Sequence, residues 1–181
     1  MLPEIFKTEE RIRILRHISL GKSATVGAVA LATGVSKGLV SGYLNLLVEE
    51  GLLRRENRAF IRDDSALWLA IKRLLNLDLL KDLIVLPAWA QGIGIYGSWA
   101  SGTNTAESDL DLWVLVDALD PGTEIRAAEL EQAIALRIHC EVNALLLTPD
   151  KVRHLGEHDR PFYTGLKTGH LTLDGEDFAT T

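Results

Sequence analysis

Two short pairs of residues in the second half of the chain have the types and spacing that phosphate and metal chemistry requires. Gly97 and Ser98 follow a short apolar run, and ten residues separate them from Asp109, which precedes an apolar residue and Asp111. An apolar run continues to Val116, and its pattern predicts a strand on which alternate side chains share a face. The two carboxylates would therefore stand on one face, about 6 to 7 Å apart along the strand.

This arrangement could bind a polyphosphate together with a metal ion. Two neighbouring carboxylates repel each other unless a cation lies between them, and Mg²⁺ commonly uses one or two carboxylates together with phosphates and waters. Gly97 allows the backbone to approach a phosphate closely. Ser98 is expected where a strand turns into a helix, and a helix N-terminus is a natural anion site. The combination implies phosphoryl or nucleotidyl transfer.

The spacing of this motif resembles that of the nucleotidyltransferase superfamily that includes DNA polymerase beta, and its minimal prokaryotic members above all. The resemblance covers roughly residues 90 to 150 and consists of a hydrophobic residue, Gly-Ser, ten residues, Asp-x-Asp and an apolar strand. It implies that Asp109, Asp111 and a third acid hold two magnesium ions. These would position the α-phosphate of a nucleoside triphosphate, with ATP as the expected substrate, for attack by an acceptor hydroxyl.

The third acid is expected on a later strand. After a helix from about Thr123 to Leu136, residues 137–147 form an extended run with one polar face, and Glu141 lies on it. By analogy with the family, Glu141 would be a metal ligand and would accept the proton of the attacking hydroxyl. The family often has Asp here, and the alternative is a solvated strand glutamate without a role.

One position departs from the family pattern. Many relatives carry Arg or Lys just after the Gly-Ser pair, where this chain has Trp99 and Ala100. Positive charge for the triphosphate must then come from elsewhere, for example from Lys167 or Arg160, or is missing. The alternative to an enzyme is therefore a non-catalytic relative that uses the site only to bind nucleotide.

The first 64 residues show a different pattern. Helices are predicted at about 9–20, 25–33 and 36–50, followed by two short strands joined by a polar turn near Asn57. The pattern resembles the winged helix-turn-helix domains of prokaryotic regulators, in which the third helix meets base edges and wing arginines meet phosphates. At those positions this chain has Ser36, Lys37, Ser41, Tyr43, Arg55 and Arg58.

The charge of the chain is unevenly distributed, which favours two separate roles. Residues 1–65 hold ten Lys and Arg against eight Asp and Glu, or +2, and the remaining residues hold nine against seventeen, or −8. A net charge of −6 argues against a protein that coats nucleic acid through bulk charge. The first segment could accordingly bind DNA or serve as a dimerisation or docking module.

Between these segments, residues 65–91 form a leucine-rich helical connector. The leucine density exceeds what one face of a surface helix needs, and two helices broken near Asn76–Asp78 are expected. The connector would either pack within the hydrophobic core of the protein or form the interface of a homodimer.

Composition limits the remaining possibilities. Hydrophobic residues make up 47% of the 181 residues, yet no apolar run is long enough to span a bilayer, and no membrane partner is expected. Cys140 is the only cysteine, which excludes an internal disulfide and, with no signal peptide at the N-terminus, favours the cytoplasm.

The sequence thus predicts an α+β protein: a winged helix-turn-helix domain at 1–64, a helical connector at 65–91 and a small α/β nucleotidyltransferase-like domain with a mixed sheet at 92–181. The predicted activity is magnesium-dependent transfer of a nucleotidyl group, most simply adenylyl, from a nucleoside triphosphate to an acceptor hydroxyl. The acceptor could be a small molecule or a partner protein. The alternative is a DNA-binding transcriptional regulator whose second domain senses nucleotide without turnover.

Overall fold

The chain divides into two compact units, one up to Lys72 and one from Arg73 onward. The computed structural model describes residues 2–180, and each unit is considered by itself below. Helix α5 (Ala66–Leu80) contains the boundary between the units. Among the described residues, no helix is both long and apolar enough to cross a membrane.

The first unit is a winged helix-turn-helix, as predicted. Its helices are α1 (Leu2–Ile5), α2 (Glu9–Ser19), α3 (Val26–Thr33) and α4 (Lys37–Glu49). Its strands, β1 (Ser23–Ala24), β2 (Leu53–Glu56) and β3 (Ala59–Arg62), form an antiparallel sheet in the order β1-β3-β2. Thr8, Thr25 and Ser36 cap the three longer helices, each side chain accepting a hydrogen bond from a backbone N–H three residues later.

Apolar residues at helical spacing make the core of the first unit. Ile14, Leu15, Val29, Leu44 and Leu47 are completely buried where α2, α3 and α4 meet. These buried positions recur at helical spacing, as the inward face of an amphipathic helix requires.

The second unit is built on a four-stranded mixed sheet, which also agrees with the predicted fold class. The strands are β4 (Gly92–Tyr96), β5 (Leu110–Leu115), β6 (Val142–Leu147) and β7 (Leu171–Gly175), in the order β6-β5-β4-β7. Only β5 and β6 are parallel, and α7 (Pro121–Ile138) connects them. The remaining helices are α6 (Gly97–Ser101), α8 (Pro149–His158) and α9 (Arg160–Gly169).

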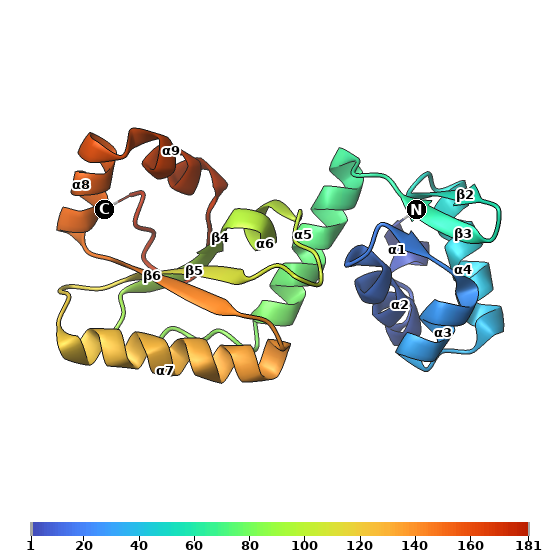
Figure 1. The fold of residues 1–181 in the computed structure, drawn as a ribbon, viewed down its shortest axis with the longest axis horizontal. Coiled ribbons are helices and arrows are strands. Elements are labelled where there is room, and N and C mark those ends of the chain that lie inside the picture. Colours follow the sequence, from blue (N-terminus) through green and yellow to red (C-terminus); the bar gives the residue numbers. More distant parts are fainter. Residues whose placement is uncertain (1, 181) are drawn as a thin grey trace. The chain divides into compact units, whose positions relative to one another are not determined.

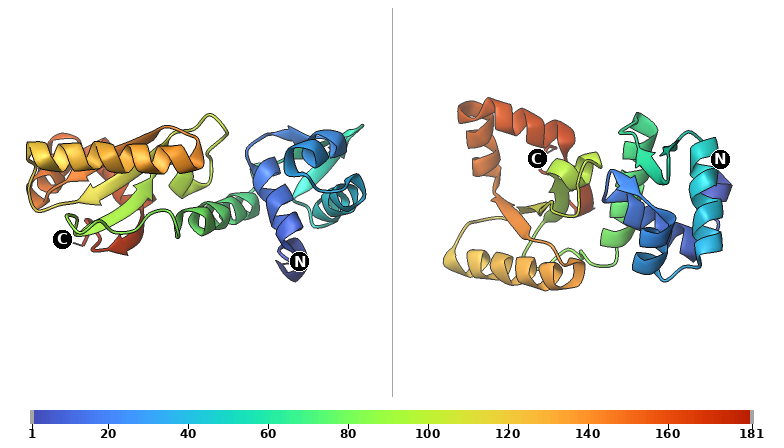
Figure 2. Two further views of the ribbon diagram at one scale, coloured as in Figure 1. Left: turned by 90° about the horizontal axis from the view of Figure 1, so that it is seen from below. Right: turned by 45° about the vertical axis from the view of Figure 1, so that its right-hand side comes forward.

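Helices cover both faces of this sheet (Figure 1). Leu112 and Val114 of β5 point to the face that packs on α7, while Trp113 and Leu115 point to the face that lies under α8, α9 and Phe178. The left panel of Figure 2 views the sheet from the α7 side. Because β5 is buried on both faces, its apolar run is nearly continuous, as expected for a central strand.

Two predicted boundaries were wrong. Helix α7 continues to Ile138, and His139 ends it in the left-handed region with φ 58°, so the next strand begins at Val142 rather than at Arg137. Helix α5 is not broken near Asn76. Asn76 can be buried because its side chain finds partners in α6 and in the loop that follows α6.

Candidate functional site

The structure brings the Gly-Ser turn and the Asp-x-Asp strand into direct contact. Strands β4 and β5 pair antiparallel so that Tyr96 lies opposite Asp111, and Gly97 is the next residue. Gly97 has φ 66°, a conformation that residues with a Cβ rarely adopt. A Cβ atom at position 97 would also lie 2.5 Å from Asp111 Oδ2. The bare backbone of Gly97 therefore leaves the space that the Asp111 carboxylate occupies.

The parallel pairing of β5 and β6 determines which polar residues stand beside the two aspartates. Asp111 lies directly opposite Asn143, and Leu110, whose N–H donates to the Glu141 carbonyl oxygen at 2.8 Å, lies opposite Val142. Asp109 and Glu141 each precede these paired positions by one residue. Asn143, which the sequence did not single out, is thus the strand neighbour of Asp111.

Burial and like charge make the Asp111 carboxylate unfavourable in its ionised form. Burial, followed by the nearby charge of Asp109, raises the pKa of Asp111, and a hydrogen bond from the Asn143 side chain opposes this shift. Burial and the charge of Asp111 also raise the pKa of Tyr96. A cation between Asp109 and Asp111 would relieve the repulsion that raises the pKa of Asp111.

The donor set fits Mg²⁺ that is shared with a phosphate. Asp109 is exposed and Asp111 is half-buried, so one carboxylate faces solvent and the other is held by the fold. Magnesium commonly takes one or two protein carboxylates, with phosphates and waters completing an octahedron. The side-chain amide of Asn143 offers a further oxygen beside them.

The predicted group of three acids is not gathered in this structure. Within residues 2–180, no three or more His, Cys, Asp or Glu side chains lie close enough together to hold a metal ion. Glu141 is exposed and precedes β6, since α7 is longer and β6 begins later than the sequence suggested. The β5–β6 register puts neutral Asn143 at the position beside Asp111.

A buried asparagine pair supports the Gly-Ser turn from behind. Asn76 Nδ2 donates to the Trp99 carbonyl oxygen at 2.8 Å and to Asn104 Oδ1 at 3.0 Å. Asn104 is completely buried, and its backbone N–H donates to the Ser98 carbonyl oxygen at 3.2 Å. These contacts fix the turn and the loop that follows it. The only signal in the sequence was a polar residue within a leucine-rich helix.

The cations considered for the triphosphate come from one helix. Arg160 begins α9, and Lys167 lies in its last turn, with its ammonium group 5.8 Å from the centre of the Tyr163 ring. Helix α9 packs against α6, which contains Gly97 and Ser98.

In the first unit, most of the predicted DNA-contacting residues of α4 are accessible, but Tyr43 is not. Ser36 and Lys37 are exposed and Ser41 is half-buried. Tyr43 is only 2% exposed, and its hydroxyl donates to the Ile5 carbonyl oxygen at 2.9 Å. The prediction that Tyr43 meets DNA was therefore wrong, because this ring belongs to the core.

The arginines of the wing differ in how they are engaged. Arg55 is exposed, and its guanidinium lies 5.7 Å from the centre of the Phe60 ring. Arg58 is exposed at the turn between β2 and β3. Arg54 instead forms ion pairs with Glu56 and Asp63. Arg55 and Arg58 thus keep the access to a phosphate backbone that the sequence predicted.

The fold defines a winged helix-turn-helix unit followed by an α/β unit with a mixed sheet. Residues 8–59, which lie within the first unit, match the MarR family. No curated protein matches the chain.

Three solved structures are similar to the chain over about three fifths of its length. The first is a toxin-antitoxin with AMP-PNP, with 26% identity, coverage of 60% of this chain and 79% of that chain, and a TM-score of 0.38. The second is the tri-AMPylated Shewanella oneidensis HEPN toxin in complex with MNT antitoxin, with 23% identity, coverage of 60% of this chain and 81% of that chain, and a TM-score of 0.38. The third is the toxin-antitoxin MntA-HepT, with 23% identity, coverage of 61% of this chain and 80% of that chain, and a TM-score of 0.33. At these TM-scores the likenesses define neither the fold nor the activity of this chain.

Proposed function

We propose that the second unit binds a nucleoside triphosphate with Mg²⁺ and transfers its nucleotidyl group to an acceptor hydroxyl. The observation that carries this proposal is the contact between Gly97 and the Asp111 carboxylate. A phosphate held at the Gly97–Ser98 turn would lie next to the two carboxylates. The resemblance of this motif to that of the nucleotidyltransferases supports adenylyl as the transferred group.

Each residue of the site has a role in this proposal. Asp109 and Asp111 hold Mg²⁺, which when bound neutralises phosphate charge and orients the triphosphate. Gly97 and Ser98 contact the phosphates through backbone N–H groups. The acceptor oxygen bonds to the α-phosphorus as the bond to pyrophosphate breaks, and Glu141 accepts the hydroxyl proton. The exposure of Glu141 and Asp109 leaves this side open to an acceptor, either a small molecule or a side chain of a partner protein.

Asn143 favours a second candidate, in which the unit binds nucleotide without turnover. A neutral amide beside Asp111 can neither accept a proton nor add negative charge for a second metal ion. Together with the match of residues 8–59 to the MarR family, this supports a DNA-binding regulator whose second unit senses nucleotide.

Both candidate functions require the second unit to bind a nucleotide together with Mg²⁺, and measuring nucleotide binding with and without Mg²⁺ tests this requirement. We expect ATP to bind the native chain more tightly with Mg²⁺ and the Asp111→Asn variant to lose this dependence. Since burial and Asp109 raise the pKa of Asp111, the native state is destabilised as pH rises through that pKa, and the variant should melt at a higher temperature at pH 7 without metal. If ATP binds the native chain and the Asp111→Asn variant with equal affinity, with and without Mg²⁺, the proposed nucleotide and metal site is refuted.

Transfer of label from α-labelled ATP separates the two candidates. An enzyme labels its acceptor, or itself where a suitable hydroxyl is near, and Asp109→Ala abolishes the label. A nucleotide sensor binds ATP with the same Mg²⁺ dependence and transfers no label to any acceptor supplied.

Binding of the first unit to DNA is tested at the wing. In a gel shift with the DNA upstream of its own gene, we expect Arg55→Ala with Arg58→Ala to weaken binding and to reduce its salt dependence. Arg54→Ala is the matched control, because Glu56 and Asp63 already neutralise that guanidinium. Equal losses in both variants would show that the wing does not bind DNA through the arginines named here.

A further inference from the structure

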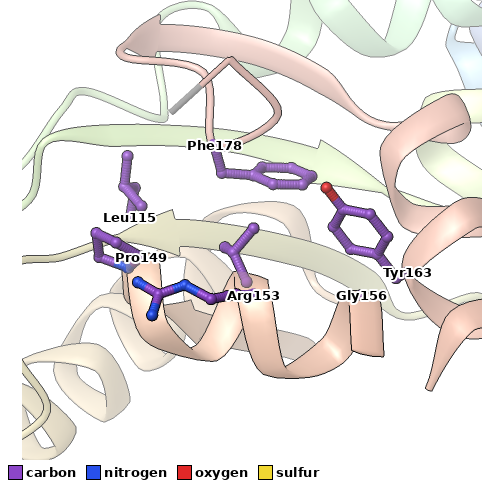
Figure 3. A pocket seen from close by; sticks show the side chains of 7 residues that line it. Leu115, Pro149, Arg153, Gly156, Tyr163 and Phe178 are labelled. Atoms are coloured by element: carbon purple, nitrogen blue, oxygen red, sulfur yellow. The ribbon is translucent and has the colours of Figure 1, made fainter. Parts of the chain in front are cut away.

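A cavity of about 270 Å³ lies on the same sheet face as Asp111 but at the other end of β5 (Figure 3). Leu115 forms part of it, four residues beyond Asp111, which corresponds to roughly 13 Å along a strand. Helix α8, Tyr163 of α9 and Phe178 line the remaining sides, and the cavity is partly open to solvent. Of these residues, only Tyr163 was named with the candidate functional site, as the ring whose centre lies 5.8 Å from the Lys167 ammonium group.

The floor of the cavity is apolar, aromatic and buried. Leu115 is completely buried, and Phe178 is 1% exposed and packs edge-on against Trp113, with ring centres 5.0 Å apart. Gly156 lies in the interior of α8, where glycine costs stability, and a Cβ atom there would already touch the Tyr163 ring at 3.6 Å. The fold thus keeps a glycine where a larger side chain would reach the ring that lines the cavity.

Two polar groups border this apolar space. Figure 3 shows the Tyr163 hydroxyl directed toward the Phe178 ring. Arg153 pairs with Asp150 at 3.0 Å, but the two side chains are 68% and 88% exposed. Ion pairs so exposed contribute little energy, so the guanidinium can turn to an anion at the cavity mouth.

We propose that this cavity binds a small aromatic carboxylate. An apolar protein cavity of about 150 Å³ holds benzene, so a cavity of about 270 Å³ accommodates one ring with a short acid chain. The ring packs on Val152, Gly156 and Tyr163, above the buried side chains of Leu115 and Phe178. The carboxylate pairs with Arg153, whose planar fork matches its geometry, and accepts a hydrogen bond from the Tyr163 hydroxyl.

Three ligands of equal size test the charge preference: 3-phenylpropionate, its neutral amide and 3-phenylpropylamine. By calorimetry on the full chain, we expect the acid to bind with a dissociation constant of roughly millimolar. The amide and the amine should bind about fivefold more weakly, the value of one favourable charged contact. In NMR spectra, the ring signals of Tyr163 and Phe178 should shift on addition of the acid.

Variants of α8 give the controls. Arg153→Gln should remove the preference for acid over amide, and Asp150→Asn, which frees the guanidinium, should strengthen binding of the acid. Gly156→Leu should abolish binding of all three ligands, and Gly156→Ala confirms that the helix tolerates a side chain. The proposal is overturned if the acid does not bind, if the amine binds as tightly, if Arg153→Gln keeps the preference, or if the shifts lie elsewhere. No nucleotide or metal is present, so the outcome is independent of the function proposed above.

Discussion

Gly97 is constrained by its own backbone and by the Asp111 carboxylate. Its positive φ alone would disfavour any other residue, and the 2.5 Å approach of Asp111 Oδ2 to a Cβ at this position adds a direct collision. The second constraint links the phosphate turn to the metal-binding strand. A change at Gly97 therefore disturbs both halves of the site.

Replacing Gly97 with Ala should weaken nucleotide binding and lower the unfolding free energy by about 1 to 2 kcal/mol, the cost of a left-handed alanine. Chemical denaturation and ATP binding measure the two effects. Gly165→Ala in α9 is the matched control, because nothing lies within 4 Å of its Cβ position and its φ is ordinary. That variant should be about 0.5 to 1 kcal/mol more stable. Native-like ATP binding by Gly97→Ala would contradict the placement of the phosphate.

Lys72 is a buried cation in the first-unit half of α5. It is 1% exposed, and burial, followed by the charge of Arg62, lowers its pKa to about 8 while Asp64 opposes the shift. The unfolded chain therefore binds this proton more tightly than the native state does. Stability should rise with pH between about 8 and the ordinary value of 10.5.

Lys72→Met should make the unfolding free energy less dependent on pH between about 8 and 10.5, because it removes the buried titrating group while keeping the length of the side chain. Denaturation at pH 7 and pH 9.5 should show a rise with pH in the native chain and a flatter profile in the variant. Lys37→Met, at an exposed position, should leave the profile unchanged. If the stability of the native chain and that of Lys72→Met rise equally with pH, a group other than Lys72 causes the rise.

At the scale of elements, the register between β5 and β6 decides the charge of the site. That register depends on where α7 ends, and the sequence did not reveal this end. Residues 137 and 138 continue the helix, and His139 adopts the left-handed conformation that Asn or Gly more often supplies. The alternation in 138–144 looked like a strand although its first residues belong to a helix.

Asn143→Asp should place a second carboxylate directly beside Asp111. Without metal, repulsion should lower the melting temperature, and Mn²⁺ should then raise it by more than it raises that of the native chain. Asn143→Ala removes the amide without adding charge and should show no enlarged Mn²⁺ effect. If the Asp variant behaves like the Ala variant, Asn143 does not stand at the metal position.

Sequence reasoning succeeded where local chemistry determines position. The turn at Gly97–Ser98 and the helices and hairpin of the first unit follow from spacing and periodicity, which are local, whereas the roles of Asp109 and Asp111 stay predictions. Asn76 and Asn143 were missed because their partners come from distant segments. Tyr43 was misassigned because an amphipathic ring fits either an exposed or a buried face of α4, and only the Ile5 carbonyl oxygen decides between them.

At the scale of the whole molecule, the two units share one helix. Lys72, near the middle of α5, belongs to the first unit, whereas Asn76 and Leu80 belong to the core of the second. A fragment that carries the second unit must therefore include the last turns of α5.

We expect a fragment of residues 73–181 to unfold cooperatively and a fragment of residues 81–181 to be less stable by about 3 kcal/mol or more. The shorter fragment loses the buried Leu80 side chain and the two hydrogen bonds of Asn76. Thermal melts followed by circular dichroism compare the two fragments. Equal midpoints would mean that α5 contributes nothing to the second unit.

The pairing of β4 with β7 has a consequence for synthesis on the ribosome. Gly92 pairs with Gly175, and Phe178 completes the core on the α8–α9 side of the sheet, so one of the two strand partners of β4 is made after all the other strands of the sheet. A nascent chain therefore carries β4 with one edge open until β7 has emerged, and open strand edges are sites of aggregation. The winged helix, whose partners are close in sequence, can fold before β7 has been made.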